Sequence, residues 1–170
     1  MILEGTPEQF IPSKAEAQRL CDRRYGVGAD GMVFLTIPGS KGAHADLRLL
    51  NSDGGEAEIS GNGTRCAAAY LASKGITGNP LVIQTPAGVK TLRLLTGRGP
   101  QWEFEMFLGR PILSPDAIPF VPDRPVKEPI VGFPLPLSGG PRAATVTSMG
   151  NPHCSIAVEG FEWDWRASGK

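Results

Sequence analysis

The sequence has no excess of charge of either sign, since 17 lysines and arginines balance 17 aspartates and glutamates across 170 residues. Without a basic surplus there is no electrostatic reason to expect a surface for nucleic acid or for an anionic membrane. The chain also lacks an apolar run of the ~18 residues that a membrane helix needs, and it lacks the basic start and apolar core of a secretory signal. We therefore predict a cytoplasmic protein whose partners are small molecules or other proteins.

Cysteine and histidine are scarce. The chain has three cysteines, Cys21, Cys66 and Cys154, whereas a disulfide scaffold has many cysteines and an even number of them. The small, odd count favours buried free thiols. The two histidines, His44 and His153, are far apart in the sequence, and no Cys-x-x-Cys or paired-histidine spacing occurs. We therefore expect no metal site.

Glycine and proline are abundant in contrast. The chain has 22 glycines and 16 prolines, about a fifth of all residues against a usual share of roughly 12%. Such a chain turns often. Between residues 110 and 142 the prolines recur every few residues, too often for a helix or a central strand. We interpret this segment as an extended edge segment or a connector.

The spacing of polar and apolar residues predicts a mixed α/β (α+β) protein. Ser13 and Glu16 have the spacing of a capping box, which predicts a helix that ends at Gly26. Residues 64–72 predict a second helix with almost no polar face after Arg65, so this helix must be enclosed. Patterns typical of strands cover residues 32–37, 45–51, 81–85, 89–95, 101–108 and 143–149, with a continuation or return at 155–158. A sheet that wraps a central helix follows.

Residues 26–31 (Gly-Val-Gly-Ala-Asp-Gly) have the Gly-x-Gly-x-x-Gly spacing of a dinucleotide-binding loop. That loop must leave a strand and open a helix, so that the pyrophosphate meets the helix amides. Here the order is reversed, because the loop leaves a helix and enters a strand. We interpret it as a turn.

The segment from Asn51 to Cys66 ends at the start of the enclosed helix. Residues 60–63 (Ser-Gly-Asn-Gly) bring flexible backbone to this point, where unpaired N–H groups and the positive end of the helix dipole favour a carboxylate. The alternative is that Ser60 or Asn62 is only an N-cap.

A second polar turn, residues 150–153 (Gly-Asn-Pro-His), follows an apolar strand. The fixed backbone of Pro152 could hold the amide of Asn151 and the imidazole of His153 toward a ligand. The alternative is that His153 is a structural residue whose hydrogen bonds are satisfied within the protein.

Taken together, these segments resemble the signature blocks of the diaminopimelate epimerase family. The blocks are residues 51–54 (Asn-Ser-Asp-Gly), 60–66 (Ser-Gly-Asn-Gly-Thr-Arg-Cys) and 149–154 (Met-Gly-Asn-Pro-His-Cys). The helix and loop at 19–31 are also similar to that family. The similarity runs from about residue 13 to near the C-terminus, in the order that the family has.

The resemblance implies a diaminopimelate-epimerase-like lobe, a curled and mostly antiparallel sheet around a central helix, in an enzyme of two such lobes. It implies an isomerase that interconverts LL- and meso-diaminopimelate without a cofactor, in the biosynthesis of lysine and of a peptidoglycan precursor. In this family one cysteine from each lobe stands on either side of the α-carbon. By resemblance, Asn51, Gly61, Asn62 and Asn151 bind the amino-acid substrate. Ser60 occupies the catalytic position and His153 tunes the neighbouring acid-base group.

The chain departs from the family at several positions. Ser60 replaces the family's catalytic cysteine, and Cys66 lies a full turn or more away within the helix, so we do not expect it to substitute. The family's opening strand, with its asparagine, has no counterpart in residues 1–12. Gly31 stands where some members carry a glutamine. We expect one lobe over residues 1–170, with the proline-rich connector at 110–142 and the second lobe absent.

These departures leave three alternatives open. The chain by itself is expected to be inactive, because a serine hydroxyl is a much weaker acid than a thiol. Completed by a second lobe, it could be a related one-thiol amino-acid racemase or a dehydratase-type enzyme. It could also be a non-catalytic lobe that binds a carboxylate, or that pairs as a homodimer through the surface that its missing lobe would cover.

Overall fold

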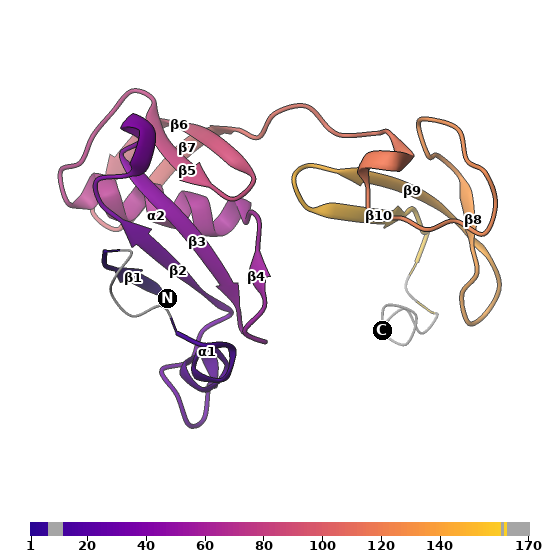
Figure 1. Cartoon of the computed structure of the whole chain (residues 1–170), viewed down its shortest axis with the longest axis horizontal. Helices are drawn as coiled ribbons and strands as arrows, with labels where there is room; N and C mark the ends of the chain where they lie inside the picture. Colours follow the sequence, from indigo (N-terminus) through magenta and orange to yellow (C-terminus); the bar gives the residue numbers. More distant parts are fainter. Residues whose placement is uncertain (7–11, 161, 163–170) are drawn as a thin grey trace. The chain divides into compact units, whose positions relative to one another are not determined.

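The computed structural model describes residues 1–6, 12–160 and 162. Within it the chain divides into two compact units, Met1–Leu108 and Gly109–Lys170, whose elements are labelled in Figure 1. Each unit is described by itself. We refer to them below as unit 1 and unit 2.

Unit 1 is built on a seven-stranded sheet whose main path has the order β1-β2-β3-β5-β6-β7. The pairs β1–β2 and β3–β5 are parallel, and the others are antiparallel. The strands are β1 (Ile2–Glu4), β2 (Gly31–Thr36), β3 (Ala45–Asn51), β4 (Glu56–Ala57), which pairs with β3, β5 (Leu81–Thr85), β6 (Gly88–Arg98) and β7 (Gln101–Phe107). A short 3-10 helix, η1 (Ser40–Gly42), connects β2 to β3. The expected curled, mostly antiparallel sheet is confirmed.

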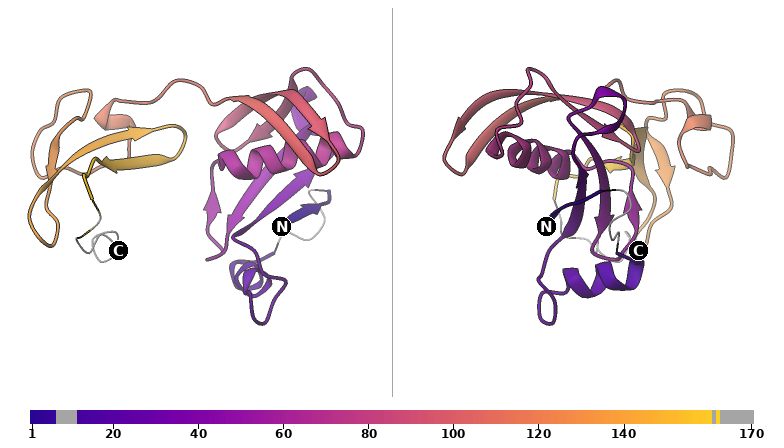
Figure 2. Two further views of the ribbon diagram at one scale, coloured as in Figure 1. Left: turned by 180° about the vertical axis from the view of Figure 1, so that it is seen from behind. Right: turned by 60° about the vertical axis from the view of Figure 1, so that its left-hand side comes forward.

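Helix α2 (Gly61–Ser73) lies against the inside of the curve that this sheet makes (Figure 2). Ala67, Ala68 and Leu71 are fully buried in the main core, together with apolar side chains of the sheet. The opposite face, which includes Arg65 and Cys66, is exposed. The central helix is therefore confirmed. The sheet covers only one side of it, however, and the apolar residues on the other side are small ones such as Cys66, which can be exposed at low cost.

Helix α1 (Lys14–Cys21) covers the other face of the sheet, at β2 and β3. The expected capping box is present, since Ser13 Oγ accepts a hydrogen bond from the Glu16 amide and the Glu16 carboxylate accepts one from the Ser13 amide. In the antiparallel register Met32 lies opposite Leu50, and both face α1. Their neighbours along the strands face α2, so two cores share one pair of strands.

The first strand was not expected. Residues 2–4 form β1, which pairs in parallel with β2 from Ile2 opposite Val33 to Glu4 opposite Leu35. Three residues are too few to show a two-residue period, and the partner strand lies about thirty positions further along the chain. Residues 2–4 thus form a strand where none was expected, but it contains no asparagine. That the family's opening strand, with its asparagine, has no counterpart here stays a prediction. Residues 7–11 lie outside the described part.

Unit 2 contains a three-stranded antiparallel sheet of order β10-β9-β8. Its elements are η2 (Pro115–Ala117), a 3-10 helix, β8 (Phe133–Leu135), β9 (Arg142–Ser148) and β10 (Pro152–Ile156). Within the proline-rich segment, β8 is an edge strand, and Ile118, Ile130 and Phe133 are buried in a small core with Val146. The segment is therefore extended, as expected, and it also supplies most of this core. That both units belong to one lobe stays a prediction.

Candidate functional site

Unit 1 has a pocket of about 560 Å³ where β1, the loop before β2, the end of β3 and the start of α2 meet. Three of the four site residues predicted in this unit line it: Asn51, Ser60 and Asn62. Its other polar and charged lining residues are Arg23, Asp30 and Cys66. The structure therefore brings the two ends of the segment between Asn51 and Cys66 together around one cavity.

Ser60 is the N-cap of α2. Its Oγ accepts a hydrogen bond from the Gly63 amide at 3.1 Å, and its carbonyl accepts bonds from the Thr64 amide and the Thr64 hydroxyl, both at 2.8 Å. Ser60 is thus an N-cap, and its further role in a site stays a prediction. The backbone amides of Gly61 and Asn62, the first two of the helix, donate no hydrogen bond to any group in the described part of the chain. These donors remain for a ligand.

Gly63 allows the helix to start this close to the sheet. A Cβ atom at this position would lie 2.7 Å from Leu49 Cδ1 and 3.4 Å from Val33 Cγ2. A larger residue would therefore force either the Leu49 side chain or the first turn of α2 to move. The glycine sets the distance between the helix N-terminus and the floor of the pocket, where Val33 and Leu49 both lie.

The two asparagines of this pocket are held in different ways. The Asn51 backbone makes a tight turn with residues 54 and 55, in which its amide donates to Gly55 O at 2.8 Å and its carbonyl accepts from Gly54 N at 2.9 Å. This turn presents the exposed side chain of Asn51 at the end of β3. Asn62 Oδ1 accepts a hydrogen bond from Arg65, so the amide group of Asn62 keeps its N–H donors for a ligand.

The glycine loop is a turn, as interpreted from its order in the chain. The amides of Val27 and Gly28 both donate to Leu20 O, which closes the C-terminal end of α1, and Gly28 has a φ of +83°. The carboxylate of Asp22 accepts bonds from the amides of Arg24 and Tyr25, which lowers the pKa of Asp22.

Residues 28–31 of this turn also line the pocket, which the sequence did not predict. Arg23 and Asp30 form an exposed ion pair of 2.6 Å among the lining residues. Gly31 has no side chain to reach into the pocket, as expected. A Cβ atom at this position would lie only 2.8 Å from Leu50 O, so a larger residue would be crowded here. No sequence pattern could have found this wall, because it depends on the loop folding back over β2 and β3.

The cysteines correct one expectation. All three are free, but only Cys21 is buried, while Cys66 and Cys154 are exposed. Cys66 also lines the same pocket as Ser60, although it lies in the second turn of α2. Cys66 is thus a turn away from Ser60, as expected from the sequence, and that it does not substitute for the family's catalytic cysteine stays a prediction.

In unit 2, Asn151 and His153 lie together at the start of β10, with His153 Nε2 3.1 Å from Asn151 Oδ1. Both side chains are exposed, and His153 is paired in the ladder with Thr147 of β9. The structure joins these two residues to each other. Their meeting with Ser60, Gly61 and Asn62 stays a prediction, since the two units are described separately.

Two further observations concern only residues 1–6, 12–160 and 162. No group of three or more His, Cys, Asp and Glu side chains there is arranged to hold a metal ion. No helix there has both the length and the apolar character that crossing a bilayer requires. His44, the histidine outside the site, accepts a hydrogen bond at Nδ1 from the Val82 amide at 3.0 Å and is a structural residue.

The fold is similar to that of amino-acid racemases and epimerases. A hydroxyproline epimerase from Agrobacterium vitis, solved with bound trans-4-hydroxy-L-proline, matches with a TM-score of 0.58 at 14% identity, over 85% of this chain and 40% of that chain. A probable proline racemase from Agrobacterium radiobacter K84, solved with bound carbonate, also has a TM-score of 0.58, at 17% identity over 84% of this chain and 39% of that one. At these identities the likeness shows the class of fold.

Sequence comparison then identifies the family. The family model for diaminopimelate epimerase matches residues 3–106, which is nearly all of unit 1. The diaminopimelate epimerase of Desulfitobacterium hafniense is 38% identical over 160 residues, covering 94% of this chain and 55% of that protein. The chain belongs to the diaminopimelate epimerase family. It spans about half the length of the curated relatives that it matches.

Proposed function

We propose that this chain is part of a diaminopimelate epimerase-like enzyme, and that its unit 1 holds the carboxylate end of the amino acid. The observation that carries the proposal is the pocket at the N-terminus of α2, where Asn51, Ser60 and Asn62 meet. Two unpaired amides and a helix dipole favour an anion there. The reaction would move a proton at the α-carbon and interconvert LL- and meso-diaminopimelate in the cytoplasm, with no cofactor.

Removal of an α-proton next to a carboxylate places negative charge on that carboxylate. The charge is stabilised best by donors that are already fixed in place before the reaction. In unit 1 the helix fixes the amides of Gly61 and Asn62, and the turn at the end of β3 fixes Asn51. We assign these three residues to substrate binding.

The hydrogen bonding of Ser60 favours a donor over a base. Its Oγ already accepts the Gly63 amide, so its hydroxyl proton is left to donate toward a ligand. A serine hydroxyl does not ionise usefully without an adjacent base. No histidine is among the residues that line this pocket. We propose that Ser60 binds the carboxylate and that this chain alone does not catalyse epimerisation.

Unit 2 supplies the second group of the proposed site. The contact between His153 and Asn151 supports a pair that acts together, with Asn151 on the substrate and His153 tuning the neighbouring acid-base group. A second lobe would provide the thiol on the opposite face of the α-carbon.

Gly61 offers a direct test of carboxylate binding. It is the first helical residue, where proline is well tolerated, and Ser60 before it is extended at φ −134° and ψ 119°, as a residue before proline must be. Gly61→Pro therefore removes one N–H while the helix remains. Gly61→Ala is the matched control, because its Cβ would meet only Arg65 Nη1, at 3.5 Å, and it keeps the N–H.

Calorimetry with diaminopimelate decides the outcome. We expect the wild type and Gly61→Ala to bind with equal affinity and Gly61→Pro to bind about tenfold more weakly, the effect of losing one hydrogen bond to a charged group. If the wild type does not bind at millimolar ligand, or if the two variants bind alike, the pocket is not a carboxylate site and the proposal is wrong.

The serine at the catalytic position favours a second candidate, a carboxylate-binding lobe without catalysis. Exchange of the α-proton of diaminopimelate into deuterated solvent, followed by NMR, separates the two. Exchange that appears in Ser60→Cys but not in the wild type would identify a lapsed epimerase site. Binding without exchange in either protein would support the binding lobe, or a site that needs a second lobe for any proton transfer.

A further inference from the structure

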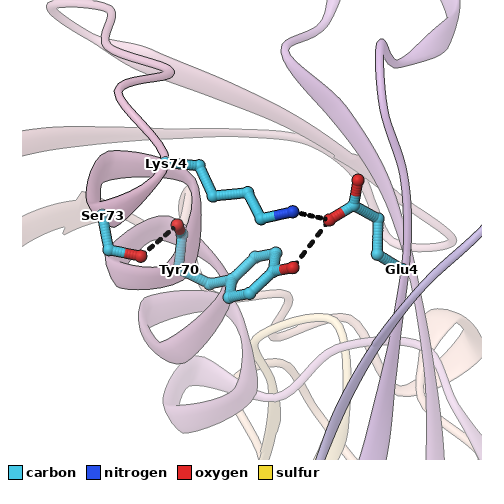
Figure 3. Close-up of polar contacts among 4 residues, drawn as sticks. All are labelled: Glu4, Tyr70, Ser73 and Lys74. Atoms are coloured by element: carbon cyan, nitrogen blue, oxygen red, sulfur yellow. Dashed lines mark hydrogen bonds and ion pairs between the residues drawn. The ribbon is translucent and has the colours of Figure 1, made fainter.

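Three side chains join the first strand of unit 1 to the far end of its central helix. Glu4 of β1 accepts hydrogen bonds at one carboxylate oxygen from the Tyr70 hydroxyl and from Lys74 Nζ, both at 2.6 Å (Figure 3). Lys74 Nζ also lies 5.0 Å from the centroid of the Tyr70 ring. We call Glu4, Tyr70 and Lys74 the β1 clamp.

The clamp is a set of mutually dependent contacts. Tyr70 lies in the last turn of α2 and Lys74 is the C-cap, four residues further on, so their side chains lie on the same side of the helix end. Hydrogen bonding to Lys74 and then to Tyr70 lowers the pKa of Glu4, and the same bond to Glu4 raises the pKa of Lys74. Both charges are therefore present at neutral pH, and the loss of any one member weakens the other contacts.

Global stability is a poor explanation for this cluster. The side chains of Lys74 and Glu4 are 45% and 38% exposed, and ion pairs with such access to water contribute little to stability. The strand that the clamp fixes is otherwise held by the packing of Ile2 and Leu3 and by its backbone bonds to β2, which the Gly5 amide extends by donating to Leu35 O at 2.9 Å. It has three residues, and within the described sheet it pairs only with β2.

The alternation of side chains along β1 connects the clamp to the pocket. Ile2 packs against the core on the α2 side, Leu3 packs against the core on the α1 side, and Glu4 returns to the α2 side. Ile2 lies about 7 Å from Glu4 along the strand and lines the pocket with Met1. The position of Glu4 against α2 therefore sets the position of this wall.

We infer that Glu4, Tyr70 and Lys74 are positioning residues, which hold β1 against α2 and so fix the distance between the Ile2 wall and the N-terminus of α2. The clamp grips the last turns of the helix, and the pocket lies at its first turn. None of the three residues lines the pocket itself. The relevance of this wall to diaminopimelate rests on the proposed function, whereas the positioning of β1 does not.

The test uses the full chain and two independent measurements. Glu4→Gln removes the charge at nearly constant shape, Tyr70→Phe removes only the hydroxyl, and Lys74→Arg keeps the charge. Glu105→Gln is the matched control, because Glu105 forms an exposed ion pair of 2.7 Å with Arg93 in the same unit, between β6 and β7. NMR records the backbone amide signals of Ile2, Val33 and Gly61, and calorimetry records diaminopimelate binding.

We expect Glu4→Gln and Tyr70→Phe to shift the amide signals of Ile2 and Val33 and to weaken binding about two- to tenfold. Lys74→Arg should leave both at nearly wild-type values, and Glu105→Gln should change neither. The positioning role is overturned if the amide signals of Ile2 and Val33 stay in place in Glu4→Gln and Tyr70→Phe, as they should in the control Glu105→Gln. This outcome does not depend on whether the ligand binds. Shifted signals in a chain that binds no diaminopimelate would uphold the clamp and reject the proposed function instead. If Glu4→Gln fails to fold, Tyr70→Phe decides the question.

Discussion

The polar turns of the two units differ in how much packed structure lies behind them. In unit 1 the turn before α2 lies over a sheet that is packed on both faces, and Gly63 sits against Leu49 and Val33 of its core. In unit 2 the turn with Asn151 and His153 belongs to an exposed strand of a three-stranded sheet, whose core cluster has four buried residues. Ligand-binding groups gain precision from packing behind them. The predicted site residues of unit 1 are therefore supported by a packed core, whereas Asn151 and His153 of unit 2 are exposed.

The comparison predicts that core damage in one unit will leave the other intact. Leu71 is fully buried in unit 1, and Ile130 is 2% exposed in unit 2. Leu71→Ala should lower the free energy of unfolding of unit 1 by about 2–5 kcal/mol, with little change in unit 2. Ile130→Ala should do the reverse. Hydrogen exchange measured residue by residue checks this, and equal loss of protection in both units from either variant would show one cooperative structure.

A smaller effect is expected at the junction of α2 and the sheet. Gly63→Ala places a Cβ 2.7 Å from Leu49 Cδ1, and overpacking of this kind costs about 1–3 kcal/mol. Gly61→Ala is the control, since its Cβ finds space. Denaturant unfolding of both variants measures the difference. If the two alanines are tolerated equally, the start of α2 is not held against the sheet as tightly as the contrast with unit 2 requires.

Ser60 should contribute less than the packing at Gly63. Ser60→Ala removes the Oγ that accepts the Gly63 amide, and loss of such a cap costs about 1 kcal/mol. Ser60→Asp keeps a capping acceptor and should retain the stability, but its negative charge should repel a carboxylate ligand. Thermal unfolding and calorimetry together would separate the two roles. Normal diaminopimelate binding by Ser60→Asp would mean that Ser60 is an N-cap and nothing more.

Local signals in the sequence predicted most elements of unit 1. Ser13 and Glu16 form the capping box that their spacing indicated, and β3 and β5 have the predicted bounds. The start of α2 was placed three residues late, because Gly61 and Gly63 have low helix propensity, and the Ser60 cap and the packing of Gly63 that offset it are not visible in a local pattern. The three-residue strand β1 was missed for a related reason, since only pairing with a distant strand defines it.

The site was predicted less completely than the fold. One continuous segment contains Asn51, Ser60 and Asn62, and the start of a helix can be recognised from a local sequence pattern. The walls supplied by Ile2 and by residues 28–31, and the exposed thiol of Cys66, depend on tertiary folding. No local pattern contains that information.

The smallest expected effect is a difference between the units in acid. The pKa is lowered for Glu4, Glu16, Asp22 and Glu56, all in unit 1, by hydrogen bonds to each carboxylate. A carboxyl group with a lowered pKa stabilises the fold above its unfolded pKa, and this contribution is lost as the pH falls through the folded value. For the glutamates the loss therefore begins near their ordinary pKa of 4.5 and continues below it.

Unit 1 should thus lose protection from hydrogen exchange as the pH falls below about 4.5, and the β1 amides should lose it first through Glu4. Raising the salt concentration should reduce the part of this loss that comes from the exposed ion pairs of Glu4 and Glu56, because mobile ions screen them. The part due to Asp22 and Glu16 should persist, since those carboxylates bond to nearby backbone amides. Earlier acid unfolding of unit 2 would mean that its exposed sheet, and not the charged contacts of unit 1, limits the stability of the chain.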